Sequence, residues 1–536
     1  MKYFLSLILF LLSASIFAKS YPTSDALCDG YPQANIGTLE GICVGVVAQK
    51  SQSIPWVKPR KVVQVTGTNQ FIITDMGGWT RGKGVVWLLD VGQLHVKATP
   101  LLTDLNLPHG LAIGPKGLFY VGEADKIFRF KLHNGKATEV ETIVSNLPDS
   151  TTHSHPLSHF IFDQDHHLIV NLGAKSDQCK EDIKKGACSS LTDDLDTHAA
   201  LRRYYYIEAA NLWSTEYDVI ATGLRNSMAL ASHKSGTLLQ AENSIDLPDL
   251  HAPYEEINFI EDQRFYGWPY CYDNKKINPL WQEKGDSICA DKEKHTQPWV
   301  VLPAHAAPLD MLYYNGEMFT SLKGKLLLSW HGYRQTGHRL VAYDVDEQGR
   351  PIHAKDAYYH TDIAENFSKN EFSVKTPFPK EISNVAQGVE IISGLNAIPD
   401  YRPMGRPAGI TVTDDGAIWL VDDVNKALLR IAKGTVNKED RAEHVETEIK
   451  DTSLSKFFIN IDNQDVKRVL TQHCQACHDL SETNSGITIP KTWLVKNQDK
   501  TLIEERVFDS PMRPMPPNST LSIEEASTIR KWLEAM

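Results

Sequence analysis

The sequence predicts a mainly β protein, a six-bladed β-propeller followed by a small all-α domain. Three observations lead to this fold class. Short apolar runs alternate with Gly, Asp and Asn turns over residues 56–432, and one strand–turn–strand unit recurs six times within that span. Helical periodicity then follows near the C-terminus. The chain has 536 residues, which leaves room for two or three domains.

The first 18 residues have the pattern of a secretory signal peptide. A basic start precedes an apolar stretch from Phe4 to Phe17, and Ala18 offers a cleavage site. The apolar stretch is short for a membrane span, and no later segment qualifies as one. We therefore expect export, to the periplasm in a Gram-negative source, with no integral membrane segment after cleavage. An uncleaved anchor is the alternative.

The charge of the chain limits its partners. The formal net charge is −12 at pH 7, with 67 acidic and 55 basic residues. Such an acidic balance argues against a nucleic-acid partner, because a phosphate backbone would be repelled. The composition is otherwise that of an ordinary globular protein with a large core.

Six of the eight cysteines form three couples that are close in sequence. An exported protein meets an oxidising compartment, where such couples form disulfides that close loops. The first couple would staple residues 19–55, ahead of the propeller, and buried thiols are the alternative. The expected disulfides are Cys28–Cys43, Cys179–Cys188 and Cys271–Cys289.

The recurring unit is a basic or imidazole residue beside Pro or Gly, an apolar strand, a polar turn and a second apolar strand. The first three copies follow at intervals of 49 and 46 residues, the natural length of a four-stranded blade. The later copies are more widely spaced and must carry inserted loops. The leading residues of the six copies are Arg60, His109, His155, Arg225, His305 and Arg406.

These leading residues should lie together. In a propeller the innermost strand of each blade starts near the central channel, so residues in one register converge on one mouth. Taken singly, each is more often a solvated turn residue or a hydrogen-bonded histidine. Six cationic or imidazole groups in one register of an acidic protein indicate an anion site at the end of an apolar tunnel.

After the last blade, residues 433–454 turn charged and lose the strand pattern, which is typical of a linker. The remaining domain, residues 455–536, contains two cysteines followed at once by histidine. This is the pattern for attaching a c-type haem, with thioethers from Cys474 and Cys477 and an iron ligand from His478. A redox disulfide or half of a zinc site would need a βαβ setting or a second ligand pair, and neither is nearby.

The sixth iron ligand is expected downstream, in the proline-rich loop 511–517. The loop holds Met512 and Met515, and a thioether ligand raises the haem potential. The Met-Pro-Pro context that small cytochromes use favours Met515 over Met512. A surface loop with two exposed methionines is the alternative.

Two helices should enclose the haem. Apolar residues recur at helical spacing over 463–472, and Ser522 to Glu525 reads as a capping box that opens a last helix. Together with the haem motif and the methionine loop, residues 455–536 resemble a class I cytochrome c domain. The resemblance implies one-electron transfer. The expected packing face of the last helix is Ala526, Ile529, Trp532 and Leu533.

The propeller should then hold a redox centre or receive electrons from one. No Gly-x-Gly-x-x-Gly follows a strand, and no His-Glu-x-x-His or Walker loop is present, so a nicotinamide or flavin on a Rossmann unit is unsupported. A small, multiply carboxylated quinone would suit a ring of arginines and histidines, because guanidinium pairs bidentately with carboxylate.

The propeller region contains four characteristic segments, which are GLRN at 223–226, EEIN at 255–258, YGWPYC at 266–271, and GRPAG at 405–409 with the aspartates at 422–423. These segments resemble the soluble glucose and sorbosone dehydrogenases that depend on pyrroloquinoline quinone (PQQ), with the sorbosone branch closest. The resemblance covers most of residues 59–431 and implies a six-bladed propeller with PQQ on the channel axis and a calcium ion. The glucose branch follows its Arg-Asn pair with Pro-Gln-Gly, whereas this chain has Ser-Met-Ala at 227–229, which puts glucose itself in doubt.

Carried over to this chain, the resemblance implies roles for single residues. His155 would be the general base and Arg225 would stabilise charge on the quinone oxygen. His153 and His159 are rivals for the base. The residues expected to bind PQQ are Arg60, His109, Asn226, His305, Arg334 and Arg406, and the backbone ligands expected for calcium are Ser244 and Ile245.

The sequence therefore predicts a periplasmic quinohaemoprotein that oxidises an aldose or a related polyol or aldehyde. Electrons would pass from PQQ to haem c and on to an external acceptor, either a soluble cytochrome or the respiratory chain. One alternative is a calcium-dependent propeller lactonase, which would gather Glu, Asn and Asp around its metal. The other is a sugar- or protein-binding propeller with an electron-transfer haem domain.

Overall fold

The computed structural model of the protein describes most of residues 21–434 and four short segments beyond them. The predicted signal peptide lies outside the described residues. The described residues are 21, 23–34, 36–92, 96–149, 152–192, 197–247, 249, 251–332, 336–362, 373–395, 405–434, 458–460, 464–473, 494–496 and 522–535.

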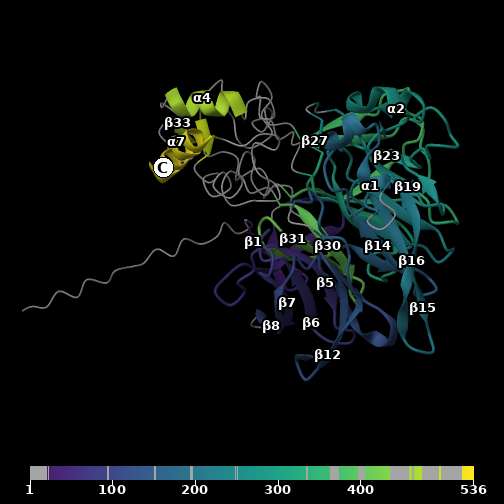
Figure 1. Ribbon diagram of the computed structural model, residues 1–536. Coiled ribbons are helices and arrows are strands. Elements are labelled where there is room, and N and C mark those ends of the chain that lie inside the picture. The colour runs from purple at the N-terminus through teal and green to yellow at the C-terminus, as the bar shows by residue number, and fades with distance from the viewer. Residues whose placement is uncertain are drawn as a thin grey trace, which may run out of the picture.

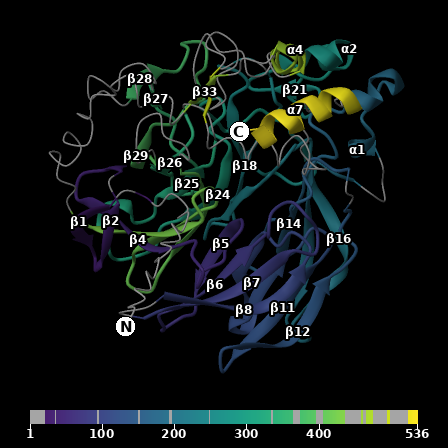
Figure 2. The ribbon, with the colours of Figure 1, turned by 90° about the vertical axis from the view of Figure 1, so that its left-hand side faces the viewer.

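Six antiparallel sheets stand around a common axis, as Figures 1 and 2 show. The first blade contains β5 (Pro59–Gln64), β6 (Gln70–Asp75), β7 (Gly84–Val91) and β8 (Val96–Leu105). The second contains β9 (Gly110–Ile113), β10 (Phe119–Gly122), β11 (Ile127–His133) and β12 (Lys136–Val144). The third contains β13 (Phe160–Phe162), β14 (Leu168–Leu172), β15 (Ala200–Ile207) and β16 (Leu212–Thr222), with the short β20 (Arg264–Phe265) added in parallel.

The other three blades draw on more distant parts of the chain. The fourth contains β17 (Ala229–Ser232), β18 (Leu238–Glu242), β19 (Glu255–Phe259) and β23 (Val300–Leu302). The fifth contains β24 (Pro308–Tyr313), β25 (Leu326–Trp330), β26 (Arg339–Tyr343), β29 (Gly388–Gly394) and β3 (Gly37–Thr38). The sixth contains β30 (Pro407–Val412), β31 (Ile418–Asp422), β32 (Ala427–Lys433), β4 (Ile42–Gln49), β2 (Tyr31–Ala34) and β1 (Thr23–Cys28).

The innermost strands form a closed ring, because each first strand contacts the next from β5 through β9, β13, β17, β24 and β30 back to β5. One apolar cluster at the hub takes residues from all six blades, so the six sequence repeats do converge. The predicted six-bladed propeller is confirmed. Members of this cluster, in blade order, include Val62, Leu107, Leu157, Met228, Leu309 and Ala408.

The N-terminal segment closes the ring. Strand β4 pairs antiparallel with β32 over its whole length, and β3 adds to the edge of the fifth blade. The sequence placed residues 19–55 ahead of the propeller, whereas in the structure the four strands within this segment, β1 to β4, are outer strands of the last two blades. Pairing the first and last parts of the chain satisfies backbone groups that an open edge would expose.

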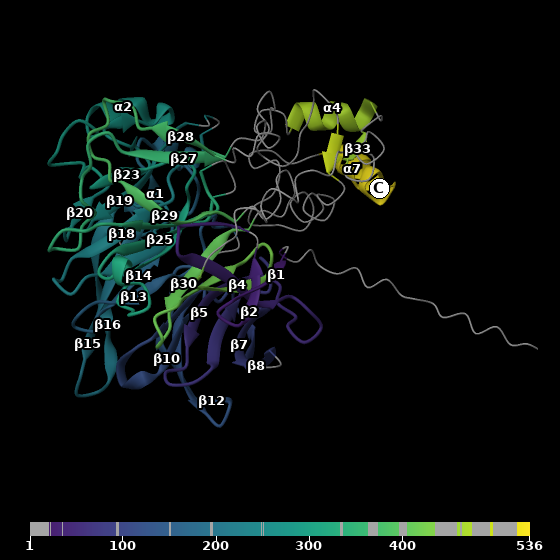
Figure 3. The same cartoon turned by 180° about the vertical axis from the view of Figure 1, so that it is seen from behind.

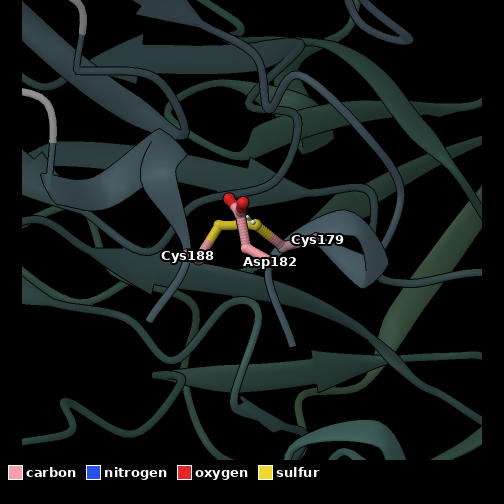
Figure 4. Close-up of side chains that lie close together, drawn as sticks. All are labelled: Cys179, Asp182 and Cys188. Atoms are coloured by element: carbon pink, nitrogen blue, oxygen red, sulfur yellow. Dashed lines mark hydrogen bonds between the residues drawn. A yellow bond between two sulfur atoms is a disulfide. The ribbon is translucent and has the colours of Figure 1, made fainter. Parts of the chain in front are cut away.

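All three predicted disulfides are confirmed, with Cα–Cα distances of 5.5 to 5.8 Å. Cys179 and Cys188 flank the carboxylate of Asp182, as Figure 4 shows. Two cysteines and an aspartate could form a metal site, but here both sulfur atoms are bonded to each other in the disulfide. The carboxylate instead accepts a hydrogen bond from the backbone N–H of Ser189, at 2.7 Å, and so fastens the loop.

Short helices and strands lie between the blade strands of the propeller. Two further helices lie beyond the last blade (Figures 1 and 3). The helices of the C-terminal region, α4 (Gln464–His473) and α7 (Ile523–Ala535), contact each other, and β33 (Phe458–Asn460) pairs with β34 (Leu494–Lys496). Among the described residues, no helix has the length and apolar character needed to cross a membrane. The smaller elements are α1 (Ser189–Thr192), α2 (Gln282–Asp286), β21 (Cys271–Tyr272), β22 (Lys276–Ile277), β27 (Tyr358–Asp362) and β28 (Ser373–Pro377).

The predicted capping box is confirmed at the start of α7. The N–H of Glu525 donates to Ser522 Oγ at 3.2 Å, and the N–H of Ser522 donates to Glu525 Oε2 at 2.9 Å. The helix expected over 463–472 is also present, as α4. The haem-binding residues expected between the two helices lie outside the described residues; they are Cys474, Cys477, His478 and Met515.

Candidate active site

A repeated hydrogen bond holds the chain at the mouth of the hub. In four blades, an acidic residue at or just after the end of the second strand accepts a hydrogen bond from a backbone N–H in the loop that leads to the first strand. The carboxylate thereby fixes the loop that carries the leading residue. The acids and the residues whose N–H they accept are Asp75 with Lys58, Glu123 with Asn106, Glu242 with Arg225, and Asp422 with Arg406.

A first group of charged residues, the Arg60 cluster, joins blades one, two, five and six. The guanidinium of Arg60 pairs with Asp423, and His331 Nε2 lies 2.9 Å from the other oxygen of that carboxylate. The Asp423 side chain is fully buried. Burial opposes its ionisation, but His331, Lys58 and Arg60 outweigh that effect and hold the pKa of Asp423 well below its ordinary value. The cluster also includes His109, which accepts a hydrogen bond from Arg60 Nε at 3.1 Å.

The bond from Arg60 determines the tautomer of His109. A guanidinium can only donate, so Nδ1 of His109 accepts and its ring proton is on Nε2. Burial and the nearby charge of Arg60 lower the pKa of His109 well below its ordinary value, so the ring is neutral. That Nε2 is buried and has no hydrogen-bond partner among the described residues. His109 therefore offers an N–H donor to a ligand in the hub.

His159 lies next to this donor. The His109 and His159 rings are 5.8 Å apart and nearly perpendicular. Burial lowers the pKa of His159 well below its ordinary value, and neither of its ring nitrogens has a hydrogen-bond partner among the described residues. Buried polar atoms without partners are rare in native proteins, so this part of the hub has unmet hydrogen-bonding capacity.

A second group, the Arg225 cluster, lies between blades three and four. Arg225 Nε donates to Asp177 at 2.9 Å, and a terminal nitrogen donates to Asp246 at 3.1 Å. The side chain of Arg225 is 8% exposed, whereas that of Asp246 is 81% exposed. A carboxylate held so close to solvent stabilises its partner weakly, so a ligand anion could replace it. The cluster consists of His155, Asp177, Arg225, Asn226, Glu242 and Asp246.

His155 and Asn226 meet at Gly173. A Cβ on Gly173 would lie 2.5 Å from the Cβ of His155 and 3.4 Å from Oδ1 of Asn226, so both side chains border this glycine. His155 Nδ1 lies 2.9 Å from the carbonyl oxygen of Ala174. A carbonyl can only accept, so Nδ1 carries the proton and Nε2 is the basic nitrogen of the neutral ring. The same backbone unit is bonded to Arg225, because the N–H of Ala174 donates to its carbonyl at 2.7 Å.

Other predicted site residues are placed as follows. His305 is half-buried, and its Nε2 lies 2.8 Å from the carbonyl oxygen of Asp249. Arg406 is half-buried, and its charge contributes to the lowered pKa of His331, which places it near the Arg60 cluster. His153, one rival for the base, contacts the ring of His198 at 4.7 Å. Arg334 lies outside the described residues.

The expected calcium ligands border a buried acidic group. The N–H of Ser244 donates to Glu255 at 2.6 Å, and Ile245 is buried beside it. Burial raises the pKa of Glu242 to about 7 and that of Glu255 to about 8. The sequence did not single out these glutamates as site residues. The strand-end position of Glu242 is the signal that could have found it.

A sequence model of the family described as TrAA12-like matches residues 56–377. An uncharacterized protein of Borreliella burgdorferi is 23% identical over an alignment of 394 residues, and the match covers 70% of this chain and 86% of that protein.

Solved structures share the fold at low sequence identity. An iodide structure of a Trichoderma reesei enzyme of carbohydrate-active enzyme family AA12 gives a TM-score of 0.55 at 16% identity, covering 77% of this chain and 100% of that one. A calcium structure of the same enzyme family from that organism gives 0.54 at 17%, covering 75% and 97%. The holo form of the PQQ domain of Coprinopsis cinerea pyranose dehydrogenase gives 0.53 at 17%, covering 76% and 99%.

Proposed function

The chain belongs to the TrAA12-like family, and from this we propose that it is a PQQ-dependent dehydrogenase of an aldose or a related polyol or aldehyde. The observation that carries the proposal is that one backbone unit connects three residues. The side chains of His155 and Asn226 border Gly173, and the N–H of the next residue, Ala174, donates to the backbone carbonyl of Arg225. Removal of hydrogen from a carbinol carbon requires a base and a cation, which His155 and Arg225 would supply. A protein of the same fold is described as the PQQ domain of a pyranose dehydrogenase.

The donors of the hub fit a multiply carboxylated quinone. Arg225 can exchange its exposed partner Asp246 for a ligand carboxylate, and His109 offers a buried N–H that has no partner among the described residues. Arg60 is different, because the fully buried Asp423 already neutralises it. We therefore assign Arg225, Asn226 and His109 to direct binding, and assign to Arg60 the orientation of His109.

In the reaction, His155 would take the proton of the substrate hydroxyl at Nε2, since the Ala174 carbonyl keeps the other nitrogen protonated. Arg225 would hold a positive charge beside the oxygen that gains electron density. Bound PQQ would supply the acceptor of the hydride, which carries both electrons from the carbinol carbon. The preorganised contacts of Arg225 mean that little reorganisation is needed when that charge develops.

We further propose that the chain carries its own electron outlet. Haem c would be attached at Cys474 and Cys477, with His478 and Met515 as iron ligands, and calcium would bind near Ser244 and Ile245. The fused domain would replace diffusion of a separate cytochrome by a high effective concentration. An external soluble cytochrome or respiratory chain would accept the electrons in the periplasm.

The proposed function is tested by mixing the purified full-length protein with PQQ, calcium and a panel of sugars. We expect the absorption band of reduced haem to grow with at least one sugar, and only when PQQ is present. A spectrum that no sugar changes would contradict the proposal. If the protein hydrolysed lactones instead, the lactonase alternative would replace it.

The haem ligand has a separate test. Met515→Ala should lower the haem potential, because loss of the thioether removes the ligand that raises it. Redox titration of the full-length protein measures the shift, and Met512→Ala is the matched control. A potential that moves in Met512→Ala and not in Met515→Ala would assign the other methionine.

A further inference from the structure

A pocket lies on the fifth blade, outside the hub. It is bounded by β26, β29, β3 and the hairpin of β27 and β28, and it encloses about 360 Å³. That volume falls within the range of small-molecule sites, about 300–1,000 Å³. We call it the blade-five pocket. Its lining includes no member of the Arg60 or Arg225 clusters.

The walls of the blade-five pocket are aromatic. Trp330, Tyr343 and Phe378 are buried, and Tyr358 is half-buried. Lys375 Nζ lies 3.6 Å from the centre of the Tyr358 ring, so this ring is held in place by a cation. The walls thus consist mainly of broad aromatic surfaces.

Charges at the rim of the pocket compensate one another. Glu390 lines the pocket, with one oxygen 2.9 Å from His360 Nδ1 and the other 3.3 Å from the guanidinium of Arg339. A carboxylate with two such partners does not present a net negative charge to a ligand. With Lys375 also beside the pocket, a cationic ligand is disfavoured although the walls are aromatic. A neutral ligand with hydroxyl groups fits these walls, because it requires no net charge from them and can use the polar groups of the rim.

We propose that the blade-five pocket binds a neutral pyranose saccharide of one or two rings. A pyranose ring has an apolar C–H face, which suits an aromatic wall, and a rim of hydroxyls, which suits the polar groups of Glu390 and His360. This site is separate from the proposed redox chemistry, because none of its contacts involves the hub or a bound quinone. It would hold sugar near the enzyme rather than react with it.

The test is calorimetric titration of the full-length protein, without added PQQ, with maltose, cellobiose and xylobiose. We expect at least one disaccharide to bind and Tyr358→Ala to weaken that binding about tenfold, because truncation of an aromatic contact in a pocket is costly. The matched control is Tyr205→Ala, which removes an exposed tyrosine of β15 that is far from this pocket in the sequence and is not part of its lining. It should bind as the unmodified protein does.

Three outcomes would overturn the saccharide site. They are absence of binding by every disaccharide, equal binding by Tyr358→Ala and the unmodified protein, and tighter binding of choline than of any sugar. If Tyr358→Ala bound sugar as tightly as the unmodified protein, the sugar would bind at another site, such as the hub. Thermal unfolding of both tyrosine variants checks that they are folded. Because haem reduction is not the readout, failure here leaves the proposed dehydrogenase activity to its own test.

Discussion

The two charged clusters of the hub use arginine in opposite ways. Arg60 is paired with a carboxylate that has no exposed surface, whereas Arg225 shares its charge between Asp177, which is 30% exposed, and Asp246, which is 81% exposed. The first pair is closed to exchange, because removal of either member would leave an uncompensated charge in the interior. The second pair can open, because water or a ligand anion can replace Asp246 at little cost.

This difference indicates that the two clusters have different roles, one structural and one in ligand binding. The Arg60 cluster holds blades together and fixes the tautomer of His109, while the Arg225 cluster presents a base and an exchangeable cation. An arginine at a propeller hub is therefore not by itself evidence of ligand binding. The exposure of its partner carboxylate decides which of the two roles it has.

The largest effect is expected at His155, the proposed general base. His155→Ala should lower the rate of sugar-dependent haem reduction by about 10²–10⁴-fold, the usual contribution of a positioned general base. Stopped-flow spectroscopy at the haem band measures the rate, and haem content should stay unchanged. His133→Ala, which removes an exposed histidine of β11, is the control. If His159→Ala abolished the rate and His155→Ala did not, the base would belong to the other cluster.

The scaffold assignment of Arg60 predicts a loss of stability. Arg60→Ala should reduce the free energy of unfolding by about 3–5 kcal/mol, because Asp423 would remain buried with a weaker set of partners. Denaturant unfolding measures the change. Arg203→Ala breaks a pair whose carboxylate is 55% exposed and should cost at most about 1 kcal/mol. Equal losses in the two variants would remove the distinction between closed and open pairs.

The Arg225 cluster should also differ in its response to pH. Burial raises the pKa of Glu242 to about 7 from an ordinary 4.5, so the folded protein holds this proton more tightly than the unfolded chain. The stabilising contribution is complete below the ordinary pKa and is lost as the pH rises to about 7, by roughly 3 kcal/mol. Glu242→Gln should make the decline in the free energy of unfolding smaller by about this amount, and the rest of the decline belongs to other buried acids such as Glu255, whose pKa burial raises to about 8. A decline of the same size in Glu242→Gln would show that another group causes it.

The smallest expected effect is on the affinity for PQQ when Arg225 is replaced by lysine. Arg225→Lys keeps the charge but loses the planar fork, so PQQ binding should weaken about tenfold while the free energy of unfolding changes little. Titration of the protein with PQQ, followed by quenching of its fluorescence, measures the affinity. An unchanged affinity would place the quinone away from Arg225 and would return Arg60 to consideration.

Features that depend on local sequence could be predicted. The strand–turn–strand units, the three disulfides and the Ser522–Glu525 capping box each involve residues near one another in the chain. A pattern of period two, a pair of nearby cysteines or a four-residue motif was enough to find them.

Contacts between residues that are distant in the chain could not be predicted from the sequence. Asp177 and Asp246 reach Arg225 from two different loops, and His331 and Asp423 come from two different blades. No local periodicity marks such partners, because ring closure alone brings them together. The pairing of β4 with β32 was missed for the same reason, since it joins residues nearly 400 positions apart.

The central claim is that a quinone binds at the Arg225 cluster of the propeller hub, and a crystal structure of the protein loaded with PQQ and calcium tests it most directly. The account predicts density for PQQ on the channel axis, with its oxygens within hydrogen-bonding distance of Arg225 and His109 Nε2 and with His155 facing the substrate side. Density for PQQ at any other surface, with Asp246 still bound to Arg225, would contradict it.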